Sequence, residues 1–143
     1  MLDLLIENGL DRNNDDSLEV YMMAEIPGNV LLAEKFAELF DGFSIGSNDL
    51  TQLTLGIDRD SELVSDIFDE QDDAVKLMIG MMIEKARDMG VKVGLCGQAP
   101  SDMPQFAQFL VKKGINSISF NPDALLKGIQ NINAAEQKHT VLL

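Results

Sequence analysis

The chain has 143 residues, 45% of them hydrophobic and only four of them proline, which predicts one globular domain with a moderate core. Its formal net charge of -13 argues against nucleic-acid binding and membrane-surface binding, because attachment to phosphate backbones or anionic lipids depends on clustered Lys and Arg. The sequence contains neither a secretory signal nor a bilayer-spanning run, so we expect a cytoplasmic protein with no membrane partner.

Short apolar runs alternate with amphipathic ones along the chain. The runs at 18–25, 42–46, 91–96 and 117–120 are predicted to be parallel strands, and the first three are apolar enough to be buried on both faces. Apolar residues at helical spacing predict a helix after each strand, and one more helix precedes the first strand. Four strand-helix units are too few for a closed eight-stranded barrel, so the pattern fits either a small open sheet or half of a barrel.

Helix boundary signals agree with this order. Ser101 or Asp102 before Pro104 supplies a capping side chain near a proline suited to a first turn. Gly90 and Gly114 are predicted to end the helices that precede them. An acidic segment separates the second unit from the third.

Three polar segments each follow a predicted strand and precede a predicted helix. They are E-I-P at 25–27, S-N-D-L-T-Q at 47–52 and C-G-Q-A-P-S-D at 96–102. In a parallel sheet with helical crossovers the carboxyl ends of all strands lie at one edge, so these segments are predicted to meet around one ligand.

Each of the three segments allows a functional and a structural interpretation. Glu25 and Asp49 either bind a hard cation such as Mg²⁺, which takes one or two carboxylates, or cap a helix and a turn. The segment from Gly46 to Asp49 either holds an anion with its backbone amides or forms a simple Asx-type cap. Cys96 is either a buried, inert thiol or a proton donor and acceptor beside a turn that Gly97 makes possible.

The acidic segment itself, from Asp58 to Asp73, is explained mainly by a solvated loop and a helix start. Within it, Arg59 either reaches an anionic ligand or pairs at the surface with Asp58 or Asp60. The lone cysteine excludes an intramolecular disulfide and a Cys-rich zinc site.

Longer motifs resemble a known family. They are M-A-E-I-P-G-N, F-S-I-G-S-N-D-L-T-Q-L-T-L-G-I-D-R-D-S, G-L-C-G-Q-A-P-S-D-M-P and G-I-N-S-I-S-F-N-P-D, and the similarity around them covers roughly residues 18–127. In this order and spacing they resemble the C-terminal end of the phosphoenolpyruvate (PEP) synthase family. Pyruvate phosphate dikinase and enzyme I of the sugar phosphotransferase system share the barrel, but their cysteine loop usually continues C-G-E, so the synthase matches better.

This resemblance implies an α/β fold in which residues 1–143 form a single, partial PEP/pyruvate-binding domain. The chain would hold about the last half of a TIM-type (β/α)₈ barrel, four strand-helix units, as a C-terminal fragment. It also implies a cytoplasmic phosphotransferase of gluconeogenesis that converts ATP, pyruvate and water to PEP, AMP and phosphate.

The resemblance also assigns roles to single residues. Glu25 and Asp49 match the Mg²⁺ ligands, and both are counted among the substrate-binding residues together with Gly46, Ser47 and Asn48. Cys96 matches the residue that transfers a proton at the substrate methyl carbon.

The family's nucleotide-binding and phosphohistidine domains, first barrel strands and main phosphate-binding arginines all precede the matched region. We therefore expect those upstream domains as partners, an inactive isolated chain, and a homo-oligomer that covers exposed strand edges. Ala99 and Met103 stand where many synthases have Gly and His. The alternatives are a stand-alone, non-catalytic half-barrel for binding or assembly, and a fragment of the related dikinase or of enzyme I.

Overall fold

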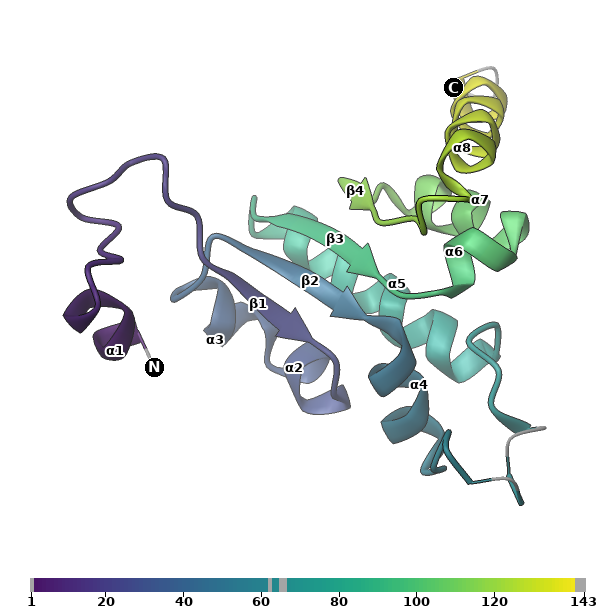
Figure 1. Ribbon diagram of the computed structural model, residues 1–143, viewed down its shortest axis with the longest axis horizontal. Helices are drawn as coiled ribbons and strands as arrows, with labels where there is room; N and C mark the ends of the chain where they lie inside the picture. Colours follow the sequence, from purple (N-terminus) through teal and green to yellow (C-terminus); the bar gives the residue numbers. More distant parts are fainter. Residues whose placement is uncertain (1, 62, 65–66, 141–143) are drawn as a thin grey trace.

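The computed structural model describes residues 2–61, 63–64 and 67–140, which form an α/β structure around one four-stranded sheet (Figure 1). The strands are β1 (Tyr21–Ala24), β2 (Gly42–Gly46), β3 (Lys92–Cys96) and β4 (Ser117–Ile118). The helices are α1 (Leu2–Glu7), α2 (Pro27–Leu31), α3 (Ala33–Ala37), α4 (Ser47–Leu55), α5 (Asp73–Asp88), α6 (Ala99–Asp102), α7 (Pro104–Lys113) and α8 (Leu125–Thr140). The predicted order of one helix followed by four strand-helix units is confirmed.

The sheet is parallel throughout, and its strands lie side by side in chain order, β1-β2-β3-β4. Its carboxyl edge therefore carries the segments that follow all four strands. Within the part of the chain that the structure describes, β1 and β4 are the edge strands, and neither has a second strand partner.

One face of the sheet forms the core. Alternate residues of the two central strands, Phe43 and Ile45 of β2 and Val93 and Leu95 of β3, are at most 1% exposed. They pack against helices on the same side, and in Figure 1 α5 passes behind β2 and β3. The helix residues in this core are Val30, Ala33, Leu50, Val75, Ile79, Met82, Ile83, Ala86, Ala99, Phe106 and Leu110.

The other side of the sheet, which we call the open face, is not covered by a helix of the described chain. On β1, Tyr21 and Met23 point to this face and are 39% and 42% exposed. The prediction that the first strand is buried on both faces is therefore wrong. Tyr21 and Met23 are exposed because β1 is an edge strand whose second face has no packing partner among the described residues.

Helix boundaries differ from the predictions in two places. The helix expected around Leu32 is two short helices, because Leu32 leaves the helical conformation with φ -108° and ψ 23° between α2 and α3. Ser101 and Asp102 do not cap α7. They belong to α6, and Met103 precedes α7 without a side-chain cap.

The glycine stop signals are confirmed. Gly114 ends α7 with φ 84°, and Gly90 follows the end of α5 with φ 70°, both in the left-handed region that favours glycine. Among residues 2–61, 63–64 and 67–140, no helix combines the length and the apolar character needed to cross a bilayer.

The open face and the two edge strands predict that the chain on its own self-associates, although its net charge of -13 opposes association. Met23→Lys should weaken that association about tenfold or more, because it places an unpaired charge on apolar surface that becomes buried. Light scattering over a dilution series measures the effect. Leu77→Lys, at a residue of α5 that is 64% exposed on the helical side, is the matched control and should leave association unchanged. A parent chain that stays monomeric at high concentration would contradict the prediction.

Candidate active site

Glu25, Gly46 and Cys96 lie in one row across the carboxyl ends of three neighbouring strands. Gly46 and Cys96 are opposite each other in the pairing of β2 with β3. A Cβ built on Gly46 would lie 3.0 Å from Glu25 Cβ and 3.1 Å from Glu25 Oε2, so the Glu25 side chain leans over the end of β2. The parallel register thus places Glu25, from the first predicted segment, and Cys96, from the third, on the two sides of Gly46.

The Glu25 carboxylate does not cap the helix that follows it. Asn29 supplies that cap, since its Oδ1 accepts hydrogen bonds from the backbone N–H groups of Glu25 and Ile26, both at 3.2 Å. The structural interpretation of Glu25 as a helix cap is therefore not the arrangement observed. Its carboxylate remains beside Gly46 on the open face.

The second segment begins a helix directly. α4 starts at Ser47, and its N-cap is Gly46, which has no side chain to bond the first backbone amides. Asp49 lies in the first turn, where a negative charge is favoured by the helix dipole. This nine-residue helix therefore presents uncapped N–H groups at the same edge as Glu25 and Cys96.

Asp49 and Arg59 form an ion pair on this edge. Arg59 Nη1 lies 3.6 Å from Asp49 Oδ1, and Arg59 Nε lies 4.0 Å from Asp60 Oδ1. The predicted surface pairing of Arg59 with Asp60 is thus present, but Asp49 is the nearer partner. The pair stays accessible, because the side chains of Arg59 and Asp49 are 40% and 48% exposed.

Cys96 ends β3 as a partly buried free thiol. Its sulfur accepts a hydrogen bond from Ser44 Oγ at 3.3 Å and donates one to the carbonyl oxygen of Ile45 at 3.6 Å. Both partners come from β2, so the neighbouring strand orients the sulfur. Ser44 was not singled out in the sequence, because only the strand register reveals the contact.

The oxygen ligands at this edge suit a hard cation, although they do not make a complete set. Within the described part of the chain, no group of three or more His, Cys, Asp or Glu side chains is arranged to hold a metal ion. Mg²⁺ commonly takes only one or two protein carboxylates and fills its other positions with water and substrate oxygens. Glu25 and Asp49 fit that smaller requirement by their chemistry, and their role as metal ligands stays a prediction.

Glu70 is a buried carboxyl group that the sequence interpretation missed. It belongs to the acidic segment assigned to solvent, yet it is only 7% exposed. Burial raises the pKa of Glu70, and the negative charges of Asp102 and Asp69 raise it further, against the opposing effect of the Ser47 hydroxyl and the Ala99 amide. The sequence offered little signal, because Glu70 stands among seven other acidic residues between Asp58 and Asp73.

Ser47, Gly97 and Glu70 join two of the site segments. A Cβ on Gly97 would overlap the Ser47 hydroxyl and would lie 3.6 Å from Glu70 Oε1, so only glycine fits there without displacing a neighbour. Ser47 Oγ and Glu70 Oε1 are both buried, and neither has a hydrogen-bond partner of good geometry among the described residues. The contact holds the loop after Cys96 against the start of α4.

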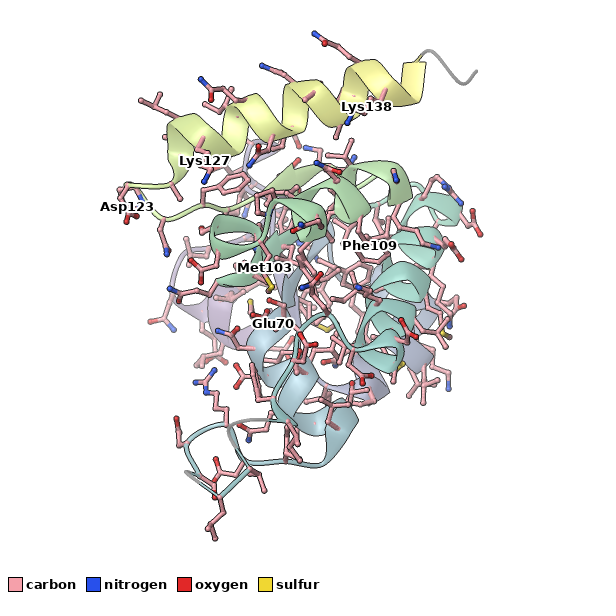
Figure 2. All side chains as sticks on the ribbon, turned by 90° about the vertical axis from the view of Figure 1, so that its right-hand side faces the viewer. Glu70, Met103, Phe109, Asp123, Lys127 and Lys138 are labelled. Carbon is pink, nitrogen blue, oxygen red and sulfur yellow. The ribbon has the colours of Figure 1, made fainter. Side chains whose placement is uncertain are left out.

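An open hollow of about 560 Å³ lies outside this contact. Glu70 and Met103 both line it, and Figure 2 shows these two side chains on the part of the molecule away from α8. The lining residues are Asn48, Arg59, Asp60, Phe68, Glu70, Gln98, Ala99, Asp102 and Met103. A second hollow, of about 400 Å³, lies under α1 beside Val20 and Asp41 at the amino ends of the strands, and is therefore remote from the three site segments.

The chain matches a known protein family over most of its length. Residues 5–137 match the family model described as PEP-utilising enzyme, PEP-binding domain. The chain belongs to this family of PEP-utilising enzymes. The sequence-based resemblance is confirmed at this level.

The relatives that resemble this chain most of the way along its length are named as synthases. It is 57% identical over 142 residues to the phosphoenolpyruvate synthase of Aquifex aeolicus, which covers 99% of the chain and 16% of that relative. It is 54% identical over 123 residues to the synthase of Escherichia coli, covering 86% of the chain and 15% of the relative. A probable phosphoenolpyruvate synthase of Staphylothermus marinus is 52% identical over 139 residues, 96% of the chain and 16% of the relative. The chain thus spans about a sixth of the length of these relatives.

The buried Glu70 predicts a specific pH dependence of stability. Because its pKa is raised in the folded state, the folded chain keeps this proton to higher pH than the unfolded chain, so its unfolding free energy falls as pH rises above about 4.5. Glu70→Gln removes that loss, and its stability relative to the parent should increase from acidic to neutral pH. Urea unfolding at several pH values measures the difference. Asp123→Asn, at an exposed carboxyl, is the control, and a Glu70→Gln difference independent of pH would contradict the assignment.

Proposed function

We propose that the chain is the C-terminal part of the PEP/pyruvate-binding barrel of a phosphoenolpyruvate synthase. The complete enzyme would convert ATP, pyruvate and water to PEP, AMP and phosphate. The observation that carries the proposal is the row of Glu25, Gly46 and Cys96 at the carboxyl ends of three parallel strands, in a chain 52–57% identical to named synthases. The names of those relatives favour the synthase over the dikinase and enzyme I.

The architecture supports a half-barrel. Four parallel strands lie in chain order with helices on one face, and both edge strands lack a further partner among the described residues. Four further strands would close this sheet into an eight-stranded barrel, pair both edges and cover the open face. In this proposal the upstream region of the complete enzyme supplies those strands, together with the nucleotide-binding and phosphohistidine domains.

The substrate site is proposed at the carboxyl edge. The free amides at the start of α4, from Ser47 and Asn48, bind substrate oxygens, and the missing side chain of Gly46 leaves room for the Glu25 carboxylate beside them. Arg59 adds a positive charge beside Asp49. The chain has 24 acidic and 11 basic residues, so its overall charge repels an anionic substrate. The attraction of such a substrate to this edge therefore depends on these local groups.

Glu25 and Asp49 are the proposed Mg²⁺ ligands. Both provide carboxylate oxygens at the edge where the substrate would lie, and Asp49 is accessible enough to exchange its pairing with Arg59 for a cation. Bound Mg²⁺ supplies electrostatic stabilisation of the charge that develops on an enolate oxygen. The protein's own part is to hold one carboxylate, Glu25, after the end of β1 and the other, Asp49, in the first turn of the helix that follows β2.

Cys96 is the proposed proton-transfer residue. In the direction of PEP formation, its thiolate removes a proton from the methyl carbon of pyruvate, and the electron pair of the broken C–H bond moves to the carbonyl oxygen to give the enolate. That oxygen then takes the phosphoryl group from phosphohistidine. The sulfur is suited to this step because it lies at a strand end on the open face and has a fixed orientation.

The proposed reaction also needs parts of the complete enzyme beyond the sixth of a synthase that these 143 residues match. Without a phosphohistidine domain it has no phosphoryl donor, so we propose that the isolated chain is inactive and that catalysis belongs to a complete, cytoplasmic enzyme of gluconeogenesis. An ATP-plus-pyruvate assay on the purified 143-residue chain tests this proposal, which predicts that no PEP is formed.

Cys96→Ala in the complete synthase is the test of the catalytic proposal. Exchange of the pyruvate methyl protons should fall by roughly 10²-fold to 10⁴-fold, the usual contribution of a positioned proton-transfer group. Phosphoryl transfer from ATP to the histidine domain should remain at the parent rate, because that half-reaction uses another site. Isotope exchange followed by NMR measures the first, and labelled-phosphate incorporation the second.

Cys96→Ser serves as the matched variant, since it keeps the size of the side chain and removes the acidic thiol. It should lose methyl-proton exchange as well. Unchanged exchange in both variants would remove Cys96 from the mechanism. Turnover by the 143-residue chain alone would refute its proposed dependence on upstream domains.

A further inference from the structure

The buried carboxyl group of Glu70 lies between two segments of the candidate site. Glu70 is only 7% exposed, and the two hydrogen-bond donors beside its carboxyl group are the Ser47 hydroxyl and the backbone N–H of Ala99. Ser47 is the first residue of α4, after β2, and Ala99 is the first residue of α6, after β3. Both donor residues are buried as well. One carboxyl group therefore contacts the segments that follow two neighbouring strands.

Gly97 shows how closely these segments approach each other. A Cβ added to Gly97 would overlap the Ser47 hydroxyl and would lie 3.6 Å from Glu70 Oε1. Gly97 directly follows Cys96, so the turn that leads away from the thiol runs past both groups. Because no spare space is left there, the position of the Glu70 side chain sets how the turn lies against α4.

The same carboxyl group borders the open hollow of about 560 Å³ beside the site. Asn48, the second residue of α4, lines that hollow, and so do Gln98 and Ala99 from the loop after β3. Asn48 is also one of the proposed substrate-binding residues. The segments that Glu70 contacts thus face a space large enough for a small ligand.

The charge of Glu70 is unfavourable for folding in this position. A buried carboxylate loses its hydration, and Asp102 and Asp69 add negative charges nearby. Arg59 lines the same hollow, but its nearest ion-pair partner is Asp49. An uncharged amide of the same shape would fill this space without that cost. A destabilising charge beside a strand-end site is typical of a functional position.

We propose that Glu70 is a positioning residue that holds the start of α4 and the loop after Cys96 in the geometry that binds pyruvate, an inference that rests on the proposed function. Its carboxylate offers one acceptor oxygen to the Ser47 hydroxyl and one to the Ala99 N–H. In the proposed site, substrate oxygens bind the amides of Ser47 and Asn48, so Glu70 acts on the substrate through a residue that it contacts. The Cys96 sulfur is oriented separately, by its partners on β2. Glu70 therefore governs substrate affinity rather than the proton-transfer step.

Glu70→Gln in the complete synthase is the central test, because glutamine keeps the size of the side chain but has only one acceptor oxygen. KM for pyruvate should rise about tenfold, the size expected for one lost hydrogen bond to a charged group, and kcat should stay within about twofold of the parent. Steady-state kinetics of PEP formation measure both. The same substitution is expected to gain stability relative to the parent toward neutral pH, so activity and stability should change in opposite directions.

Three further variants make the result decisive. Asp73→Asn changes an exposed carboxylate of the same acidic segment, at the start of α5, and should leave KM and kcat unchanged. Gly97→Ala forces the loop away from Ser47 without altering Glu70, and should raise KM for pyruvate as Glu70→Gln does. Glu70→Asp, which withdraws the carboxylate from both donors, replaces Glu70→Gln if the latter fails to fold by circular dichroism. An unchanged KM in a folded Glu70 variant overturns the inference.

A measurement without substrate separates this inference from the proposed function. Hydrogen–deuterium exchange of the backbone amides of residues 97–99 in the complete synthase reports on the loop alone. Exchange there should be several-fold faster in Glu70→Gln and unchanged in Asp73→Asn. Normal methyl-proton exchange in Cys96→Ala contradicts the proposed function, whatever the loop does. Unchanged amide exchange in Glu70→Gln contradicts the role of Glu70, whatever the chemistry of the site.

Discussion

The parallel, in-register pairing of β1, β2 and β3 is the constraint on which the candidate site depends. Glu25, Gly46 and Cys96 are 71 residues apart from first to last, yet the register sets them in one row at the carboxyl edge. A slip of one residue in β2 would turn Gly46 and Ser44 toward the helices and expose Phe43 and Ile45. Burial of those two side chains, each worth roughly 1.5–3 kcal/mol, therefore fixes the geometry of the site as well as the core.

The small residues of β2 are the second feature on which the candidate site depends. Gly42, Ser44 and Gly46 alternate on the open face, and side chains of the neighbouring strands occupy the space beside both glycines. A Cβ on Gly42 would overlap the Tyr21 ring, and one on Gly46 would crowd Met23 and Glu25. The small residues of β2 thus leave room for Tyr21, Met23 and Glu25 to lie over this strand. At the end of β2, the Glu25 carboxylate therefore lies beside Gly46, and Cys96 lies opposite Gly46 on the other neighbouring strand.

The sequence predicted the central elements better than the edges. β2 agrees with its predicted bounds and β3 begins one residue later, because both central strands carry apolar residues that are buried in the core. β1 was wrongly expected to be buried on both faces, since its local pattern does not reveal that it is an edge strand. The caps assigned to Ser101 and Asp102 were wrong because these residues form a short helix of their own, which tertiary contacts rather than local signals decide.

The site residues divide in the same way. Glu25, Asp49 and Cys96 were found from their position after predicted strands, and family motifs assigned their roles. Ser44 and Glu70 were not found, because the partner of one is set by the strand register and the burial of the other by loop packing. Alternation along β2 already placed Ser44 on the face opposite Phe43. Its partner, the Cys96 sulfur, is 52 residues further along the sequence, so the contact could not be predicted locally.

The central claim is that the three strand-end segments form one Mg²⁺ and pyruvate site. A crystal structure of the complete synthase with Mg²⁺ and PEP tests it most directly. The account predicts one ion held by carboxylate oxygens of Glu25 and Asp49, with the ligand's methylene carbon facing the Cys96 sulfur. An ion bound elsewhere in the barrel, or a ligand on the opposite edge of the sheet from Cys96, would contradict it.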